Sequence, residues 1–105
     1  MFEITDSKGI QMTFENGWTI SIQFGYGNYC DNQTNKNACS WFEKETYSSR
    51  FVSSTNAEIA IWKGDRWYDF NADDPDFASE KVTDSVKGWC SPDEVAYWIS
   101  RVSKW

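Results

Sequence analysis

The chain has 105 residues, a formal net charge of −6 at neutral pH and no histidine. The length predicts a single domain, 1–105, with a hydrophobic core of its own. The negative charge argues against DNA or RNA as a ligand, because phosphate binding needs a basic surface. Without histidine, the commonest general base and metal ligand are missing, and the chain has no nucleophile or phosphate-loop motif. We therefore expect a protein that is not an enzyme and has no cofactor.

Aromatic residues supply most of the apolar side chains. The chain has seven Trp, five Tyr and seven Phe, and it contains no leucine. So many large rings exceed what a core of this size hides, and exposed rings are typical of interaction surfaces. The alternative is that the surplus rings cover the rim of a sheet.

Cysteine usage and hydropathy predict an intracellular protein. No apolar run has the length of a membrane span, and no signal peptide is recognised. In that compartment Cys30, Cys39 and Cys90 are expected to be reduced, and an odd number of cysteines does not suit a complete disulfide framework.

Residues 1–24 are expected to form a three-stranded meander, since apolar and polar residues alternate along them. A three-residue loop at 15–17, with Gly17 in the left-handed region, keeps the apolar faces in agreement. It predicts the pairs Phe14 with Trp18, Met12 with Ile20 and Ile10 with Ile22. A similar loop at 7–9 predicts the pairs Ile4 with Met12 and Phe2 with Phe14.

Residues 25–53 are expected to form a long loop, with a strand suggested at 47–53. The loop follows the longest strand of the meander and begins GYGNYCDN. Asn, Gly and Asp suit a plain surface loop, but tyrosines beside amides also suit a binding lip. The residues of this candidate lip are Tyr26, Asn28, Tyr29, Asp31 and Asn32.

Residues 57–70 are expected to form a hairpin around a two-residue turn, Gly64-Asp65, of type II′. This turn places Ile61 opposite Tyr68 and Ile59 opposite Phe70.

Residues 71–90 are expected to form an acidic loop. From Asp65 to Asp84 the chain has seven acids against two bases, and such a face suits a basic protein partner. The candidate partner-binding acids are Asp65, Asp69, Asp73, Asp74 and Asp76. A calcium loop is a weaker alternative, because its sharp turn would need glycine where Asp74 stands. Its ligands would be Asp69, Asn71, Asp73 and Glu80. A third interpretation is a solvated loop with no ligand.

Residues 91–105 are expected to form a helix. Ser91 is its predicted N-cap, Pro92 opens the first turn and Glu94 completes a capping box. An apolar stripe follows at helical spacing: Val95, Trp98, Ile99, Val102 and Trp105. Packing this stripe on the meander gives an α+β fold, an antiparallel sheet of about five or six strands with one C-terminal helix. Trp89, just before the cap, is expected to be a core residue.

Three segments together resemble a group of small tailed-bacteriophage proteins of uncharacterised function: GWTISIQFGYGNYCDN, SSTNAEIAIW and DSVKGWCSPDEVAYWI. The matching positions are Gly17, Trp18, Ser21, Gln23, Gly25, Asn28, Tyr29, Cys30, Ala57, Glu58, Ala60, Gly88, Trp89, Ser91, Pro92, Glu94 and Val95. The resemblance covers about half of the chain and implies a viral origin and the host cytoplasm as its location, without a mechanism.

Three functions follow as hypotheses. The first is a non-enzymatic inhibitor of a host defence or nucleic-acid-handling protein, whose basic surface the acidic face would cover. The second is a protein that sequesters a small nucleotide signal, with Gln23, Tyr26, Asn28 and Tyr29 as its ligand-binding residues. The third is a virion or assembly protein. The oligomeric state is left open, with a homodimer among the alternatives.

Overall fold

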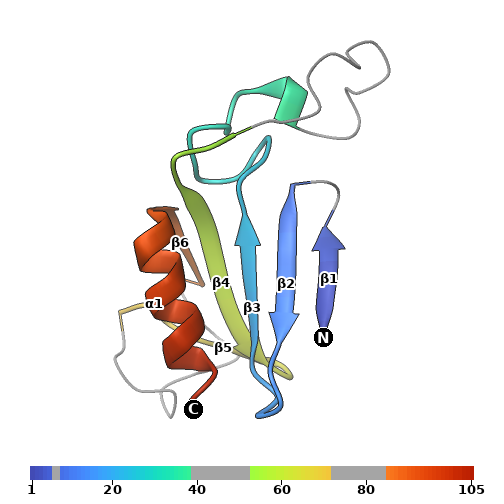
Figure 1. Ribbon diagram of the computed structural model, residues 1–105, viewed down its shortest axis with the longest axis vertical. Coiled ribbons are helices and arrows are strands. Elements are labelled where there is room, and N and C mark those ends of the chain that lie inside the picture. Colours follow the sequence, from blue (N-terminus) through green and yellow to red (C-terminus); the bar gives the residue numbers. More distant parts are fainter. Residues whose placement is uncertain (6–7, 39–52, 72–84) are drawn as a thin grey trace.

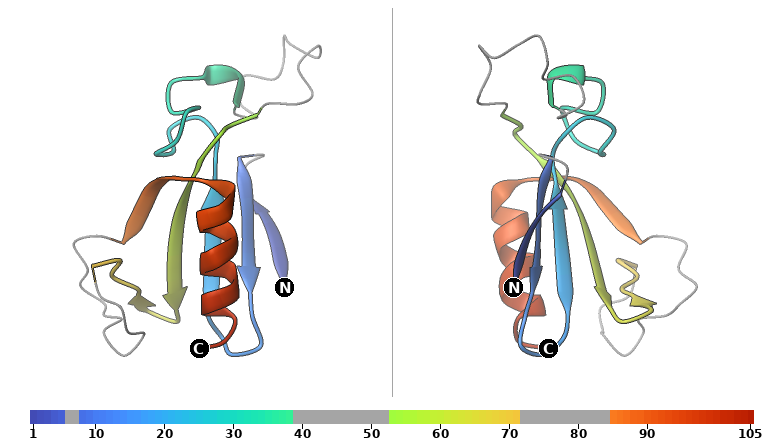
Figure 2. Two further views of the ribbon diagram at one scale, coloured as in Figure 1. Left: turned by 60° about the vertical axis from the view of Figure 1, so that its left-hand side comes forward. Right: turned by 90° about the vertical axis from the view of Figure 1, so that its right-hand side faces the viewer.

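The computed structural model describes residues 1–5, 8–38, 53–71 and 85–105. Its elements are β1 (Phe2–Thr5), β2 (Gly9–Thr13), β3 (Thr19–Gln23), a 3₁₀ turn η1 (Lys36–Ala38), β4 (Ala57–Lys63), β5 (Arg66–Trp67), β6 (Val86–Cys90) and α1 (Pro92–Val102). The strands of this described part form one antiparallel sheet in the order β1-β2-β3-β4-β5, and β6 also pairs with β4. Helix α1 lies against one face of the sheet (Figure 1, Figure 2). The predicted α+β class, with six strands and one C-terminal helix, is confirmed.

The β2–β3 hairpin has the predicted register. Met12 pairs with Ile20 and Ile10 with Ile22. The turn is closed by the amide of Gly17, which donates to the carbonyl of Phe14 at 3.0 Å. Gly17 has φ +88°, the left-handed conformation that the three-residue loop requires.

The β1–β2 hairpin is shifted by two residues from the predicted register. Phe2 pairs with Met12 and Ile4 with Ile10, so the predicted Ile4–Met12 and Phe2–Phe14 pairs are wrong. A shift of two keeps every side chain on its face, so alternation could not separate the two registers. The difference arises at Gly9, which belongs to β2 rather than to the turn.

The β4–β5 hairpin turns at Gly64-Asp65 as predicted. Lys63 pairs with Arg66, and the amide of Tyr68 donates to the carbonyl of Ile61 at 2.8 Å. Gly64 has φ +60°, whereas Asp65 does not have a positive φ, which fits a type II′ turn.

Two predictions are wrong: the pairing of Ile59 in the hairpin, and the end of the acidic loop. Ile59 pairs with Lys87 of β6 and not with Phe70. The segment 71–90 is therefore not a loop throughout, because its end, Val86–Cys90, is a strand beside the first half of β4. The strand suggested at 47–53 and residues 72–84 of the acidic loop lie outside the described residues, except for Ser53, which is not in a strand.

Helix α1 begins as predicted. Ser91 is the N-cap, its hydroxyl accepts from the amide of Glu94 at 3.2 Å, and the Glu94 carboxylate accepts from the Ser91 amide at 3.3 Å. This capping box satisfies two amides that the first turn leaves without helical partners. At the other end the helix stops at Val102, whose carbonyl accepts from the side-chain amide of Asn16 at 2.8 Å.

The apolar stripe of α1 covers only part of the sheet. Trp98 and Val102 are buried against β3, β4 and Tyr68. Along one row of paired residues, from β4 through β3 and β2 to β1, burial decreases steadily. Ile59 is 0 % exposed, Ile22 is 8 % exposed, Ile10 is half-buried and Ile4 is 82 % exposed. The half of the face over β1 and β2 therefore carries apolar side chains that α1 does not cover.

Within the described residues, no helix has the length and apolar content that crossing a bilayer requires.

Candidate protein-binding site

The loop after β3 rises above the end of the sheet and folds back on itself (Figure 1). The amide of Tyr26 donates to the carbonyl of Ala38, and the amide of Gly27 donates to the carbonyl of Gln33, both at 3.0 Å. Gly27 has φ +85°, a backbone conformation that is unfavourable for residues with a side chain. These contacts give the described part of the loop, residues 24–38, a defined shape.

Two of the predicted binding amides serve the loop itself. The Asn28 side-chain oxygen accepts from the amide of Gly25 at 3.1 Å. Asn32 is buried, and its side-chain nitrogen donates to the carbonyls of Phe24 at 2.9 Å and Ser53 at 3.1 Å. The buried Asn32 side chain is therefore used to hold the loop backbone, and the side-chain oxygen of the half-buried Asn28 has a partner within the loop.

Gln23 is also engaged within the sheet. Its side-chain nitrogen donates to the hydroxyls of Thr5 at 2.5 Å and Ser21 at 3.1 Å. Both partners lie on the sheet face opposite α1, and the bond to Thr5 links β3 to β1 across β2.

Two exposed aromatic rings lie together where the loop meets β6. Tyr29 is 45 % exposed and Trp89 is 54 % exposed, and their rings stack with centroids 5.7 Å apart and planes 25° from parallel. The amide of Trp89 donates to the carbonyl of Tyr29 at 2.8 Å, which joins β6 to the loop. The prediction that some aromatic residues are exposed is confirmed here.

The prediction that Trp89 is a core residue is wrong. In the β4–β6 pairing, Gly88 and Trp89 together lie opposite the single residue Glu58, which makes a β-bulge. Trp89 has φ +51°, the only positive φ among the described non-glycine residues. The bulge turns its ring toward Tyr29 and away from the core. Gly88 permits the close approach, since a Cβ there would lie 2.7 Å from the Cβ of Tyr29.

Two carboxylates belong to the same part of the surface, one bonded to the backbone of Tyr29 and one two residues after it. Glu58 accepts a hydrogen bond from the amide of Tyr29 at 2.8 Å. Asp31, two residues after Tyr29, accepts from the side-chain nitrogen of Asn56 at 3.0 Å and from the hydroxyl of Thr55. The hydrogen bonds from Thr55 and then Asn56 lower the pKa of Asp31 below its ordinary value, so this exposed carboxylate is charged at neutral pH. We call Tyr29, Asp31, Glu58 and Trp89 the aromatic–acidic lip.

The other predicted site residues lie elsewhere. Tyr26 is half-buried. Asp65 lies in the turn at the far end of β4 from Glu58, and Asp69 accepts from the backbone amide of Asn71 at 2.9 Å. Asp73, Asp74, Asp76 and Glu80 lie outside the described residues, so the calcium alternative is represented only by Asp69 and Asn71. Within the described ranges, no group of three or more acids or cysteines could hold a metal ion.

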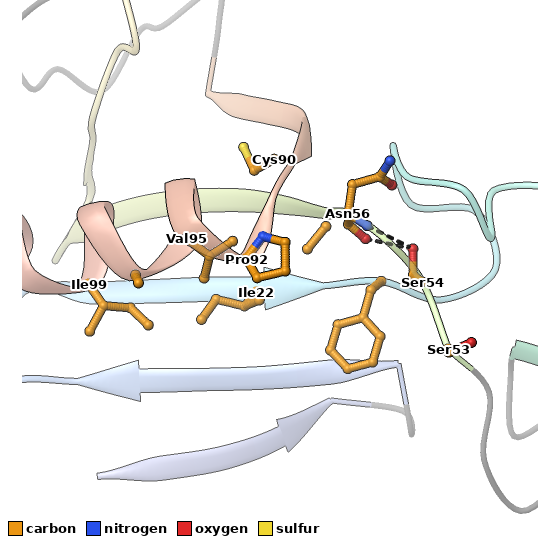
Figure 3. Close-up of a pocket in the computed structure, with 11 residues that line it drawn as sticks. Ile22, Ser53, Ser54, Asn56, Cys90, Pro92, Val95 and Ile99 are labelled. Atoms are coloured by element: carbon orange, nitrogen blue, oxygen red, sulfur yellow. Dashed lines mark hydrogen bonds between the residues drawn. The ribbon is translucent and has the colours of Figure 1, made fainter.

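A pocket of about 440 Å³ opens on the helix-bearing side of the sheet, below the loop (Figure 3). Its walls are mainly apolar and include Ile22, Phe24, Val95 and Ile99, with Ser53, Ser54 and Asn56 at one end. Cys90, also in the wall, and Cys30 are free thiols, and Cys39, the third cysteine of that prediction, lies outside the described residues. Burial, and then the charge of Glu94, raise the pKa of Cys90 to about 11, so it is not a nucleophile at neutral pH. The walls suit an apolar group and offer few hydrogen bonds.

No protein-family model, no curated protein and no solved structure matches this chain.

Proposed function

We propose that this chain is a small phage-encoded accessory protein that binds and inhibits a host protein through the aromatic–acidic lip, without catalysing a reaction. The observation that carries this proposal is the exposed stack of Tyr29 on Trp89, with the Glu58 carboxylate bonded to the Tyr29 amide and Asp31 two residues along the loop. Large exposed rings in a polar setting are typical of the residues that dominate binding energy at interfaces.

The chemistry of the lip favours a partner with a basic surface. Arginine stacks on the faces of tryptophan and tyrosine, and it forms charge-assisted hydrogen bonds with carboxylates. A carboxylate can accept about four hydrogen bonds, so Asp31, which accepts from Thr55 and Asn56, and Glu58, which accepts from the Tyr29 amide, keep acceptor sites for a partner. The net charge of −6 would also draw a basic surface toward the chain. A host protein that binds nucleic acid, including a defence protein that does so, carries a surface of this kind, because it must bind phosphates.

The residues that carry the phage resemblance also support the proposal. Tyr29, Glu58 and Trp89 come from the three separate matching segments, and the fold brings them into contact. A shared surface is one reason for three distant segments to have a common pattern, and shared packing is the other.

The nucleotide alternative has less support. A base could stack on the exposed rings, but the carboxylates of Asp31 and Glu58 would repel its phosphates. The side-chain amides of Gln23 and Asn28, which that alternative needs for hydrogen bonds, have partners within the protein.

Affinity capture with matched variants tests the proposal. The tagged protein, a Trp89→Gly variant and a Tyr97→Ser variant are each incubated with a lysate of the bacterial host. Glycine suits the positive φ at position 89, so the fold is kept while the ring is removed. Tyr97 is 57 % exposed on α1 and outside the lip, which makes it the control.

The expected result is one host protein retained by the wild type and by Tyr97→Ser but lost with Trp89→Gly, and inhibited when the purified wild type is added. Equal capture by all three proteins, or capture without inhibition, would contradict the proposal.

A further inference from the structure

Strand β1 lies at one edge of the described sheet (Figure 1). Met1 and Thr13 exchange hydrogen bonds at 2.9 and 2.8 Å. In an antiparallel pair, residues alternate between those that bond to the neighbouring strand and those that point to the other side. The amides and carbonyls of Phe2 and Ile4 therefore point outward from the sheet.

The side chains of the same two residues are apolar and exposed. Phe2 is 74 % exposed and Ile4 is 82 % exposed, and both project from the helix-bearing face. They continue into the half-buried side chains of Ile10 and Met12 on β2, in the part of the face that α1 leaves uncovered. An edge strand with outward backbone groups and exposed apolar side chains is a template for strand addition.

The charge on this edge favours another protein over a second copy of the chain. Glu3 lies between Phe2 and Ile4 and is exposed on the opposite face, and its neighbour on β2 is the uncharged Gln11. A symmetric β1–β1 pairing that sets Phe2 against Ile4 would also set Glu3 against its own copy. Like charges directly opposite each other destabilise a strand pair.

We propose that β1 accepts an extended segment of a partner protein with the pattern apolar–basic–apolar, which pairs antiparallel with Phe2–Ile4. The apolar residues extend the uncovered face, and the lysine or arginine meets Glu3. This surface is separate from the aromatic–acidic lip and does not depend on the function proposed for it.

A charge-swap experiment with the whole protein tests the inference. The probes are two cyclic hairpin peptides whose free edges read Val-Lys-Val and Val-Glu-Val, since a preformed strand loses less entropy on binding. Binding is followed by NMR, together with hydrogen exchange at the amides of Phe2 and Ile4. The variants are Glu3→Lys and, as a control with the same change in net charge, Asp65→Lys in the distant β4–β5 turn.

We expect the lysine hairpin to bind the wild type and Asp65→Lys about threefold to tenfold more tightly than the glutamate hairpin, and Glu3→Lys to reverse this preference. Exchange at both amides should slow about tenfold or more when the hairpin is bound. Equal binding of the two hairpins, or an unchanged preference in Glu3→Lys, would overturn the inference. So would self-association of the free protein that protects the same amides.

Discussion

At the scale of single residues, Trp89 gives the clearest support for the proposed binding surface. A bulky residue in the left-handed region costs about 1–2 kcal/mol, and Trp89 adopts that conformation with more than half of its side chain exposed. Its stacking on Tyr29 offsets about 0.5–1.5 kcal/mol of this cost. Strain of this kind is concentrated at functional sites.

Removing this ring should therefore change stability little. We expect Trp89→Gly to alter the free energy of unfolding by less than about 1 kcal/mol, because relief of backbone strain balances the lost stacking. Urea denaturation measures this, with Trp98→Ala as the comparison, since loss of that buried ring should cost about 3–5 kcal/mol. A loss of more than about 2 kcal/mol in Trp89→Gly would show that the residue supports the core.

The buried thiol of Cys90 should make the free energy of unfolding fall with pH in the alkaline range. Burial raises its pKa from 9.0 to about 11 in the folded chain. Between these values the unfolded chain loses the thiol proton first, so the free energy of unfolding falls as pH rises through this window. Urea denaturation of the wild type and of Cys90→Ala, near pH 8 and near pH 10, isolates the effect. The wild type should lose more stability than the variant, and equal losses would contradict the assignment.

At the scale of elements, the sequence predicted the strands whose side chains alternate and the helix whose cap is local. The register of β2 with β3 followed from the loop before Trp18, because only one loop length kept the apolar faces together. The β1–β2 register did not follow, because two registers kept the same faces. Strand β6 was not predicted, since Gly88 and Trp89 interrupt its alternation with a bulge.

The close pairing of β2 with β3 depends on Gly9. A Cβ at this position would lie 2.0 Å from the carbonyl oxygen of Ile22 on β3. We therefore expect Gly9→Ala to reduce the free energy of unfolding by about 1–3 kcal/mol, as overpacking does. Urea denaturation should show a smaller loss for Gln11→Ala on the same strand. If Gly9→Ala were as stable as the wild type, the close approach of β2 to β3 would be wrong.

The candidate site was predicted only in part. Tyr29 and Asp31 were recognised because turn-forming residues surround them. Glu58 and Trp89 were not, since their contact with the loop depends on how β4 and β6 return beside it. Nothing local in either segment shows this contact.

At the scale of the whole molecule, one sheet separates two different surfaces. The aromatic–acidic lip lies where β4 and β6 meet the loop, and the apolar edge of β1 lies on the other side of β2 and β3 (Figure 2). The chain that carries both surfaces has a net charge of −6. This arrangement suits a protein that acts by covering a basic partner, and the charges of the lip should then govern its affinity.

The most direct test is a titration of the captured host protein with two double variants that each remove two charges. Asp31→Asn with Glu58→Gln neutralises the lip while keeping an oxygen acceptor for Thr55 and for the Tyr29 amide. Glu15→Gln with Asp65→Asn removes the same charge from two exposed turns. The lip variant should bind about tenfold or more weakly than the wild type at low salt, and the control less than about threefold more weakly. Equal affinities for the two double variants would contradict a binding surface at the lip.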